Sequence, residues 1–224
     1  MMARHRDRFE AEAARLRRRM VEEQVRGRGI RDEGILAAMR SVPRHRFVPA
    51  ASLEAAYADA PQPIGAGQTI SQPFIVARLV QLAGVGPGDR VLDVGTGSGY
   101  QAAVLAALGC RVWSVEIRPE LAASAGAVLR ELGVEVSLRV GDGAAGWPEA
   151  APFAGILVAA ATPEVPAALL RQLRVGGRLV APVGDAWRQV LVVVERVAED
   201  RWVHEERDPV LFVPLVAGGP GRSA

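Results

Sequence analysis

A glycine-rich loop is the clearest chemical signal in the chain. The segment VLDVGTGSGYQAAVLA (91–106) runs from an apolar strand into a loop with glycine at alternate positions, and a helix follows at once. Glycines let the backbone turn sharply and let a ligand approach without meeting a Cβ atom, and the start of the helix offers free N–H groups. We therefore expect Gly95, Thr96, Gly97 and Gly99 to hold a cofactor.

Two acidic residues beside this loop indicate which cofactor. Glu116 ends the next predicted strand, where its carboxylate can accept hydrogen bonds from both hydroxyls of a ribose. Asp93 precedes the loop, where a carboxylate repels a pyrophosphate but suits a ligand with an ammonium and a sulfonium group. The spacing G-x-G-x-G also differs from the dinucleotide fingerprint, because position 100 is tyrosine. The loop favours S-adenosylmethionine over NAD, and a plain tight turn is the alternative.

Asp142, Gly143 and Ser71 are further candidates. Asp142 and Gly143 follow the third predicted strand, so the Asp142 carboxylate can accept from an adenine amino group, with an ordinary Asp-Gly turn as the alternative. Ser71 precedes a predicted helix and can cap its N-terminus. Such capping is compatible with a hydroxyl proton that points at a ligand.

The remaining reactive side chains predict neither histidine chemistry nor a metal site. His5, His45 and His204 stand in charged or polar segments, and each is expected to be a solvated surface histidine. No cluster of His, Asp or Glu has the spacing of metal ligands, so no metal is expected. The single cysteine, Cys110, excludes an intrachain disulfide and a cysteine-based zinc site, and its apolar neighbours predict a buried, inert thiol.

The elements that position these residues alternate between strand and helix. Strands are predicted over 90–94, 111–116, 134–140, 155–161, 178–183, 189–196 and 210–216, and helices over 74–85, 98–108, 119–132 and 163–173. This order predicts an α/β fold with a doubly wound, mostly parallel sheet. The last strands have no helices between them, so we expect an antiparallel C-terminal edge.

An N-terminal helical extension precedes this core. Residues 1–31 have apolar side chains at helical spacing, which predicts an amphipathic helix, and a second helix is predicted over 32–40 with Asp32 as its N-cap. Residues 57–73 are rich in Gly and Pro, and a loop of that length tends to be functional.

These patterns suggest three parts. Residues 1–72 form a helical region with a substrate loop, packed on the core. Residues 73–216 form the cofactor-binding core, and residues 217–224 form a flexible tail.

The composition limits the class of protein. All 27 basic residues are arginine, and 25 acidic residues leave a formal charge of 27 − 25 = +2. The arginines of 1–31 interleave with acidic residues, which favours a solvated helix face over nucleic-acid binding. No apolar run approaches the ~18 residues of a membrane span, and the N-terminus lacks the apolar segment of a secretory signal. We expect a soluble cytoplasmic protein without nucleic-acid or membrane partners.

From about Met20 to Val216 the chain resembles the protein-L-isoaspartate (D-aspartate) O-methyltransferase family. The resemblance is carried by MVEEQVRGRGIRDEGILAAMRSVPRHRFVP, PIGAGQTISQP, VLDVGTGSGYQAAVLA, GDGAAGW, PEVPAALLRQLRVGGRLVAPVG and FVPL. Many methyltransferases share the glycine loop, whereas the combination of PIGAGQTISQP with FVPL is much more specific.

The resemblance implies a Rossmann-like methyltransferase that uses S-adenosylmethionine, releases S-adenosylhomocysteine and needs no metal. The family methylates the side-chain carboxylate of L-isoaspartyl and D-aspartyl residues in age-damaged proteins and peptides. The ester then closes to a succinimide, which reopens partly to L-aspartate. Ser71 is implied as the active-site residue, and Ile64, Gly65 and Val213 are implied to line the substrate groove. The glycine loop with Asp93, Glu116 and Asp142 is implied to hold the cofactor.

Two segments depart from the family pattern. Phe153-Ala154-Gly155 stands where the family usually has Phe-Asp-Ala, and Val158-Ala159-Ala160-Ala161 stands where many members have Val-Thr-Ala-Ala. These changes remove one acid and one hydroxyl near the expected crevice.

The chemistry of the implied substrate fits the side chains of this sequence. A carboxylate with a pKa around 4 is already ionised near neutral pH, so it needs no general base. Three alternatives stay open at this point. They are a methyltransferase that acts on RNA or a small molecule, an NAD(P) oxidoreductase, and a binding module that has lost transfer.

Overall fold

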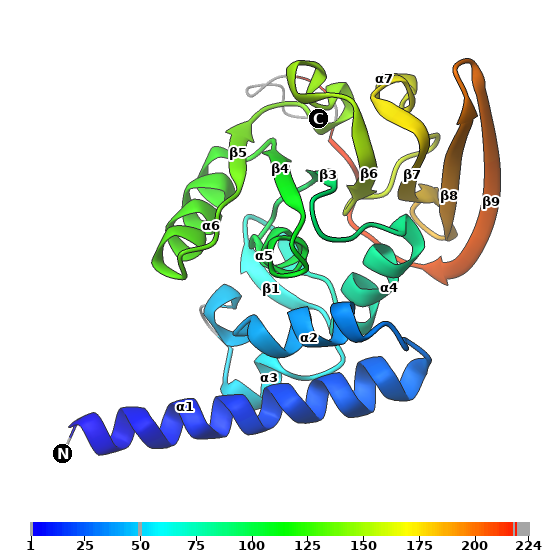
Figure 1. The fold of residues 1–224 in the computed structure, drawn as a ribbon. Coiled ribbons are helices and arrows are strands. Elements are labelled where there is room, and N and C mark those ends of the chain that lie inside the picture. The colour runs from blue at the N-terminus through cyan, green and yellow to red at the C-terminus, as the bar shows by residue number, and fades with distance from the viewer. Residues whose placement is uncertain (1, 49–50, 217, 219–224) are drawn as a thin grey trace.

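A computed structural model describes residues 2–48, 51–216 and 218, with side chains described from residue 7 onward. Its centre is a seven-stranded sheet in the order β5-β4-β3-β6-β7-β8-β9 (Figure 1). The strands are β3 (Arg90–Val94), β4 (Arg111–Glu116), β5 (Ser137–Val140), β6 (Phe153–Val158), β7 (Leu173–Gly184), β8 (Gln189–Ala198) and β9 (Arg201–Val210).

The first five strands of this order, β5 to β7, run parallel to one another. Strand β8 pairs antiparallel with β7, and β9 pairs antiparallel with β8. Strand β3 has β4 on one side and β6 on the other, so the chain order reverses beside it. In open α/β sheets the ligand crevice lies at such a reversal, outside the carboxyl ends of the strands. The predicted doubly wound sheet with an antiparallel edge is confirmed.

Helices cover the sheet and extend the fold below it (Figure 1). They are α1 (Met2–Arg19), α2 (Glu33–Ser41), α3 (Leu53–Ala56), α4 (Pro73–Ala83), α5 (Tyr100–Ala107), α6 (Pro119–Glu131) and α7 (Ala167–Arg171). The α1 helix continues as a π-helical stretch over Met20–Val25. The predicted cap of α2 is confirmed, because the Asp32 carboxylate accepts a hydrogen bond from Ile35 N at 3.0 Å.

Two apolar clusters lie on opposite faces of the sheet. Alternate residues of a strand point to opposite faces, so Val91 joins one cluster and Leu92 joins the other. The first cluster also contains Met20, Leu36 and Leu105 from the helices, all of them fully buried. The N-terminal helices therefore share the core of the sheet domain.

The end of the chain differs from the prediction. The last strand is β9, and the segment 211–216 instead crosses the carboxyl ends of the parallel strands. Its backbone meets Ala161, whose N donates to Val213 O at 2.8 Å and whose O accepts from Leu215 N at 2.6 Å. The β9 sequence RWVHEERDPV belongs to an exposed edge strand, so it carries too few apolar residues to be recognised by hydrophobic alternation. Apart from Gly218, the predicted tail lies outside the described residues.

Two other segments also differ. The helix predicted over 163–173 is reduced to α7, because Pro166 is extended at its N-cap and Thr162 pairs with Val183. The loop predicted over 57–73 contains an antiparallel hairpin of β1 (Gln62–Gly65) and β2 (Gln68–Ile70). Among the described residues, no helix combines the length and the apolar character that crossing a bilayer requires.

Candidate active site

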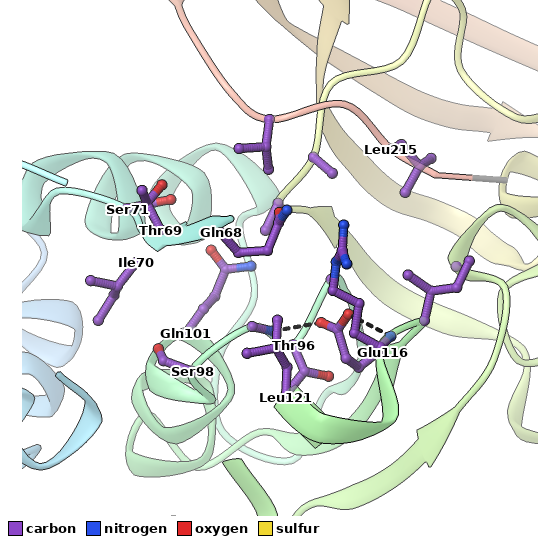
Figure 2. A pocket seen from close by; sticks show the side chains of 18 of the residues that line it. Gln68, Thr69, Ile70, Ser71, Thr96, Ser98, Gln101, Glu116, Leu121 and Leu215 are labelled. Carbon is purple, nitrogen blue, oxygen red and sulfur yellow. Dashed lines mark hydrogen bonds between the residues drawn. The ribbon is translucent and has the colours of Figure 1, made fainter. Parts of the chain in front are cut away.

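A cleft lies over the carboxyl ends of β3, β4 and β6, between the β1–β2 hairpin and the C-terminal segment (Figure 2). It is lined by Gln68, Thr69, Ile70, Ser71, Val76, Gly95, Thr96, Gly97, Ser98, Tyr100, Gln101, Val115, Glu116, Ile117, Arg118, Leu121, Gly143, Ala159, Ala160, Val213, Pro214, Leu215 and Val216. The predicted crevice therefore brings together segments that are far apart in the sequence.

The glycine loop contributes Gly95, Thr96 and Gly97 to the lining of the cleft, whereas Gly99 does not line it, and the predicted role of the loop toward a cofactor stays a prediction. Gly95, Gly97 and Gly99 all have positive φ angles, of 88°, 53° and 88°, which other residues rarely adopt. A Cβ atom on Gly99 would lie 3.2 Å from the Cβ of Ala125, so glycine also lets α6 approach the loop. Thr96 lines the cleft beside these glycines.

Glu116 ends β4 and lies across the cleft from Ser71 in Figure 2. Its side chain is buried, and its two carboxylate oxygens accept from Gly97 N at 2.8 Å and Arg118 N at 3.0 Å. A carboxylate has about four acceptor positions, so roughly two stay open toward the cleft. The predicted role of Glu116 toward ribose hydroxyls is compatible with this arrangement.

Asp93 is fully buried behind the loop and does not line the cleft. Its carboxylate accepts from Gln101 Nε2 and from Ser114 Oγ, both at 2.7 Å, and Ser114 Oγ lies 2.6 Å from Thr96 Oγ1. Burial raises the pKa of Asp93 to about 6, and these two hydrogen bonds oppose the rise. In this structure Asp93 anchors two cleft residues, Thr96 and Gln101, and its predicted direct role toward the cofactor stays a prediction.

Asp142 and Gly143 lie at the end of β5. The Asp142 carboxylate accepts from Ala144 N at 2.8 Å and Gly218 N at 2.9 Å, so it stabilises the local turn. Gly143 lines the cleft, and a Cβ atom there would lie 2.6 Å from Val94 Cγ1. The hydrogen bond from adenine to Asp142 stays a prediction.

Ser71 lies on the opposite wall, directly after β2 and before α4. The N-cap of α4 is Gln72, so the capping role considered for Ser71 is wrong. Among the described residues nothing hydrogen-bonds the Ser71 hydroxyl, whereas the Ser71 carbonyl accepts from the buried Arg44 at 2.9 Å. The hydroxyl therefore lies in the cleft wall without an intramolecular partner.

The three residues implied to line the substrate groove have different positions. Val213 lines the main cleft, and Ile64 lines a smaller hollow that adjoins it at Gly97 and Ser98. Gly65 has a φ of 95° in the turn of the hairpin and lines neither space.

No histidine lines the cleft among the described residues. His204 is exposed as predicted, although it lies in β9. The predicted surface position of His45 is wrong, because the ring is partly buried with Nδ1 2.8 Å from Tyr57 Oη. Burial also lowers the pKa of His45. The predicted inert cysteine is confirmed, since Cys110 is buried and burial raises its pKa to about 12.

Sequence reasoning missed several cleft residues. Gln101, Tyr100 and Arg118 all line the cleft, and Arg44 holds the Ser71 carbonyl from behind. Gln101 and Tyr100 follow the glycine loop directly, so their position was a usable signal. Nothing in the local sequence indicates the contact of Arg44, which lies 27 residues before its partner.

The comparisons with known proteins agree with this geometry. The model of the family described as Protein-L-isoaspartate(D-aspartate) O-methyltransferase matches residues 15–219. The chain belongs to this family. A protein-L-isoaspartate O-methyltransferase of Methylorubrum extorquens is 54% identical over 205 residues, which are 92% of this chain and 90% of that protein. One of Gloeobacter violaceus is 50% identical over 202 residues, which are 90% of this chain and 98% of that protein.

Solved structures of isoaspartate O-methyltransferases have the same fold. One of them is 28% identical to this chain with a TM-score of 0.81, and the matched region covers 91% of this chain and 67% of the chain in that structure. A second is a structure from Plasmodium falciparum in complex with S-adenosyl-L-homocysteine. It is 24% identical to this chain with a TM-score of 0.77, and the matched region covers 89% of this chain and 98% of the chain in that structure. Family membership confirms the predicted Rossmann-like fold and the class of S-adenosylmethionine-dependent protein-L-isoaspartate O-methyltransferases.

The residues of the cleft fit S-adenosylmethionine. Gly95, Gly97 and Gly143 add no side chain to the lining of the cleft, so a ligand can approach their backbone closely. Glu116 keeps acceptor capacity for hydroxyl groups, and Ile117 and Leu121 add apolar surface for a base. Among the described residues, no group of three or more His, Cys, Asp or Glu side chains is arranged to hold a metal ion.

Proposed function

We propose that this cleft methylates the side-chain carboxylate of L-isoaspartyl, and also D-aspartyl, residues in age-damaged proteins. The observation that carries the proposal is the arrangement of Ser71 and Glu116 on opposite walls of one cleft, in a chain that matches the family over residues 15–219. One wall offers acceptors for a nucleoside, and the other offers a free hydroxyl for a carboxylate.

On the cofactor side, Glu116 binds the ribose hydroxyls, and Gly95, Thr96 and Gly97 hold the remainder of the nucleoside and its amino-acid part, while Gly99 lets α6 approach the loop. Asp142 and Gly143 bind the adenine, and Asp93 holds Thr96 and Gln101 in place. S-adenosylmethionine supplies an electrophilic methyl group when bound. The protein's task is to hold donor and acceptor in line, since well-oriented reactants within about 3–3.5 Å gain most of the acceleration that positioning gives.

On the substrate side, Ser71 donates its hydroxyl proton to the carboxylate and fixes its direction. The carboxylate is ionised near neutral pH, because its pKa is around 4, so no side chain has to remove a proton. The hydrogen bond from Ser71 must stay modest, because the negative charge disappears as the ester forms. A cleft without histidine is therefore sufficient for this reaction.

The hairpin suits a substrate with variable neighbours. The turn at Gly65, Ala66 and Gly67 has little side-chain bulk, and β2 leads directly to Ser71. Main-chain hydrogen bonds to an extended segment recognise a peptide independently of its side chains. Ile64 and Val213 then border the groove, and Gly65 shapes the hairpin beside it. We expect damaged proteins to be the partners, and a cytoplasmic location without nucleic-acid or membrane partners stays a prediction.

The product ester completes the repair without further catalysis. The neighbouring backbone nitrogen attacks the ester carbonyl and expels methanol, which leaves a succinimide. Water then opens the succinimide, partly to normal L-aspartate.

The test is transfer of labelled methyl groups from S-adenosylmethionine to two peptides that differ only in Asp or isoAsp at one position. We expect base-labile label on the isoAsp peptide alone. Label on both peptides or on neither contradicts the proposal. Calorimetric binding of S-adenosylmethionine without transfer would identify the binding-module alternative instead.

A further inference from the structure

Arg44 is a fully buried cation behind the substrate wall of the cleft. It lies in a 3-10 turn (Arg44–Phe47) and is 0% exposed. Its Nε donates to Ala56 O at 2.8 Å and its Nη2 donates to Ser71 O at 2.9 Å. The guanidinium also lies over the ring of Tyr100, with Cζ 4.8 Å from the ring centroid. Tyr100 in turn lines the cleft.

This cation has no carboxylate partner among the described residues. Asp59 is the acidic residue that acts on it from a distance, and Asp59 already forms an ion pair with Arg28 at 2.8 Å. Arg44 Nη1 and Tyr100 Oη are both buried without a hydrogen-bond partner. A buried charge without a counter-charge destabilises a fold, so its presence requires a compensating role.

The neighbours of Arg44 indicate that role. Its two carbonyl acceptors belong to the last residue of α3, Ala56, and to Ser71, which lines the cleft directly after the β1–β2 hairpin. Both carbonyls are held by one planar group, which a smaller or more flexible side chain cannot reproduce. Burial lowers the pKa of Arg44. A guanidinium nevertheless stays protonated in proteins, so the charge is permanent.

We propose that Arg44 is a positioning residue for methyl transfer, which fixes the backbone of Ser71 and places a permanent positive charge behind the binding position of the anionic carboxylate. Arg44 does not line the cleft, so it acts through Ser71 and through its electric field. The charge favours the ionised carboxylate over a neutral ligand, and the hydrogen bond to the Ser71 carbonyl holds the backbone from which the Ser71 hydroxyl projects. This inference rests on the proposed function.

The first experiment compares Arg44→Gln and Arg44→Lys with Arg40→Gln, which removes one arginine from the neighbouring surface ion pair with Glu22. We expect Arg44→Gln to lower kcat by about tenfold or more and to raise KM for the isoAsp peptide by about fivefold or more. Arg44→Lys keeps the positive charge but loses the planar pair of donors that binds both carbonyls. We therefore expect its KM to be closer to the wild-type value than its kcat. The Kd of S-adenosylmethionine stays within about twofold in all folded variants, because that contact is independent of Arg44.

A binding measurement separates the charge from a merely structural role. The probes are the isoAsp peptide and the same peptide with isoasparagine, which has a neutral amide of equal shape, each titrated in the presence of S-adenosylhomocysteine. We expect the wild type and Arg40→Gln to prefer the isoAsp peptide, and Arg44→Gln to lose most of that preference. An equal loss of affinity for both peptides overturns the electrostatic part of the proposal.

A double-mutant cycle tests the action through Ser71. In a Ser71→Ala background, Arg44→Lys should lower kcat much less than in the wild type, because coupled residues have non-additive effects. Additive losses overturn the positioning role. A folded variant binds S-adenosylmethionine with a Kd near that of the wild type. If Arg44→Gln does not, the double-mutant cycle of Arg44→Lys with Ser71→Ala still tests the positioning role. If the wild type itself neither binds nor methylates the isoAsp peptide, the proposed function fails rather than this inference.

Discussion

At the scale of single residues, the cleft is built from side chains that serve the fold and the ligand together. Glu116 binds the N–H groups of Gly97 and Arg118 and keeps acceptor capacity toward the cleft. Asp93 holds Gln101 directly and Thr96 through Ser114. Ser71 keeps a hydroxyl without an intramolecular partner, while its carbonyl binds Arg44.

The role of Glu116 is tested by Glu116→Ala. Charged hydrogen bonds of this kind contribute about 1.5–3 kcal/mol each, so we expect the Kd of S-adenosylmethionine to rise by about tenfold or more. Glu116→Gln keeps one acceptor and should give an intermediate value. Glu120→Ala, in the exposed first turn of α6, is the matched control. Isothermal titration calorimetry measures all four proteins, and an unchanged Kd for folded Glu116→Ala removes this residue from the site.

The buried carboxyl of Asp93 makes stability depend on pH. Its pKa in the folded protein is raised to about 6, whereas an unfolded aspartate titrates near 4. The folded state therefore binds this proton more tightly, and the stabilisation that results is present at low pH and lost as the pH rises through about 6.

We therefore expect the difference in unfolding free energy between the wild type and Asp93→Asn to favour the wild type increasingly as the pH falls from about 7 to about 4.5. Urea unfolding at several pH values measures this difference, with the exposed Asp200→Asn as a control. A difference that is constant with pH shows that Asp93 has an ordinary pKa.

The sequence was sufficient to predict the positions of those site residues that are set by the order of neighbouring elements along the chain. The glycine loop and Glu116 follow directly from strand, turn and helix in succession. The position of Asp93 was predictable, but its hydrogen bonds to Gln101 and Ser114 depend on how α5 and β4 pack around it. The burial of Arg44 depends on contacts with Ala56, Ser71 and Tyr100, which are distant in the sequence. His45 packs against Phe9 and Tyr57, so its charged neighbours in the sequence were misleading.

At the scale of elements, the central strands and helices were predictable because apolar runs and capping residues mark them. The errors lie where proline or exposure weakens that pattern. Pro166 shortens the helix before β7, and the exposed β9 lacks an apolar alternation. The hairpin of β1 and β2 was also missed, because its strands have only four and three residues.

One departure from the family pattern has a packing reason. A Cβ atom on Gly155 in β6 would lie 2.4 Å from Val85 Cγ1, so the glycine leaves room for the valine that follows α4. We expect Gly155→Ala to lower the free energy of unfolding by about 1–3 kcal/mol, because an overpacked core has to shift. Urea unfolding measures the loss. The double variant Gly155→Ala with Val85→Ala should recover part of it, and an unchanged single variant would contradict the packing argument.

At the scale of the whole molecule, the N-terminal region and the sheet share one apolar core. Ala13, Met20 and Leu36 belong to the same buried cluster as Val104 and Val180. The division into a helical region, 1–72, and a core, 73–216, therefore describes the chain order rather than two separate hydrophobic cores.

This shared core predicts a single cooperative unfolding transition. Circular dichroism at far-ultraviolet wavelengths reports all helices, whereas fluorescence reports the four tryptophans at 113, 147, 187 and 202, all in the sheet domain. We expect the two signals to coincide in urea, as two-state unfolding requires. A helical transition that precedes the fluorescence change would show that the N-terminal region unfolds independently.

The role of the Ser71 hydroxyl in methyl transfer is measured by kcat for Ser71→Ala on the isoAsp peptide at saturating S-adenosylmethionine. We expect a loss between about tenfold and a thousandfold per folded molecule, with the Kd of S-adenosylmethionine nearly unchanged, because the hydroxyl only orients the carboxylate. The Ser71 hydroxyl makes no capping hydrogen bond in α4, so little stability should be lost. A folded variant with wild-type kcat would show that Ser71 does not orient the carboxylate and that other residues of the cleft do.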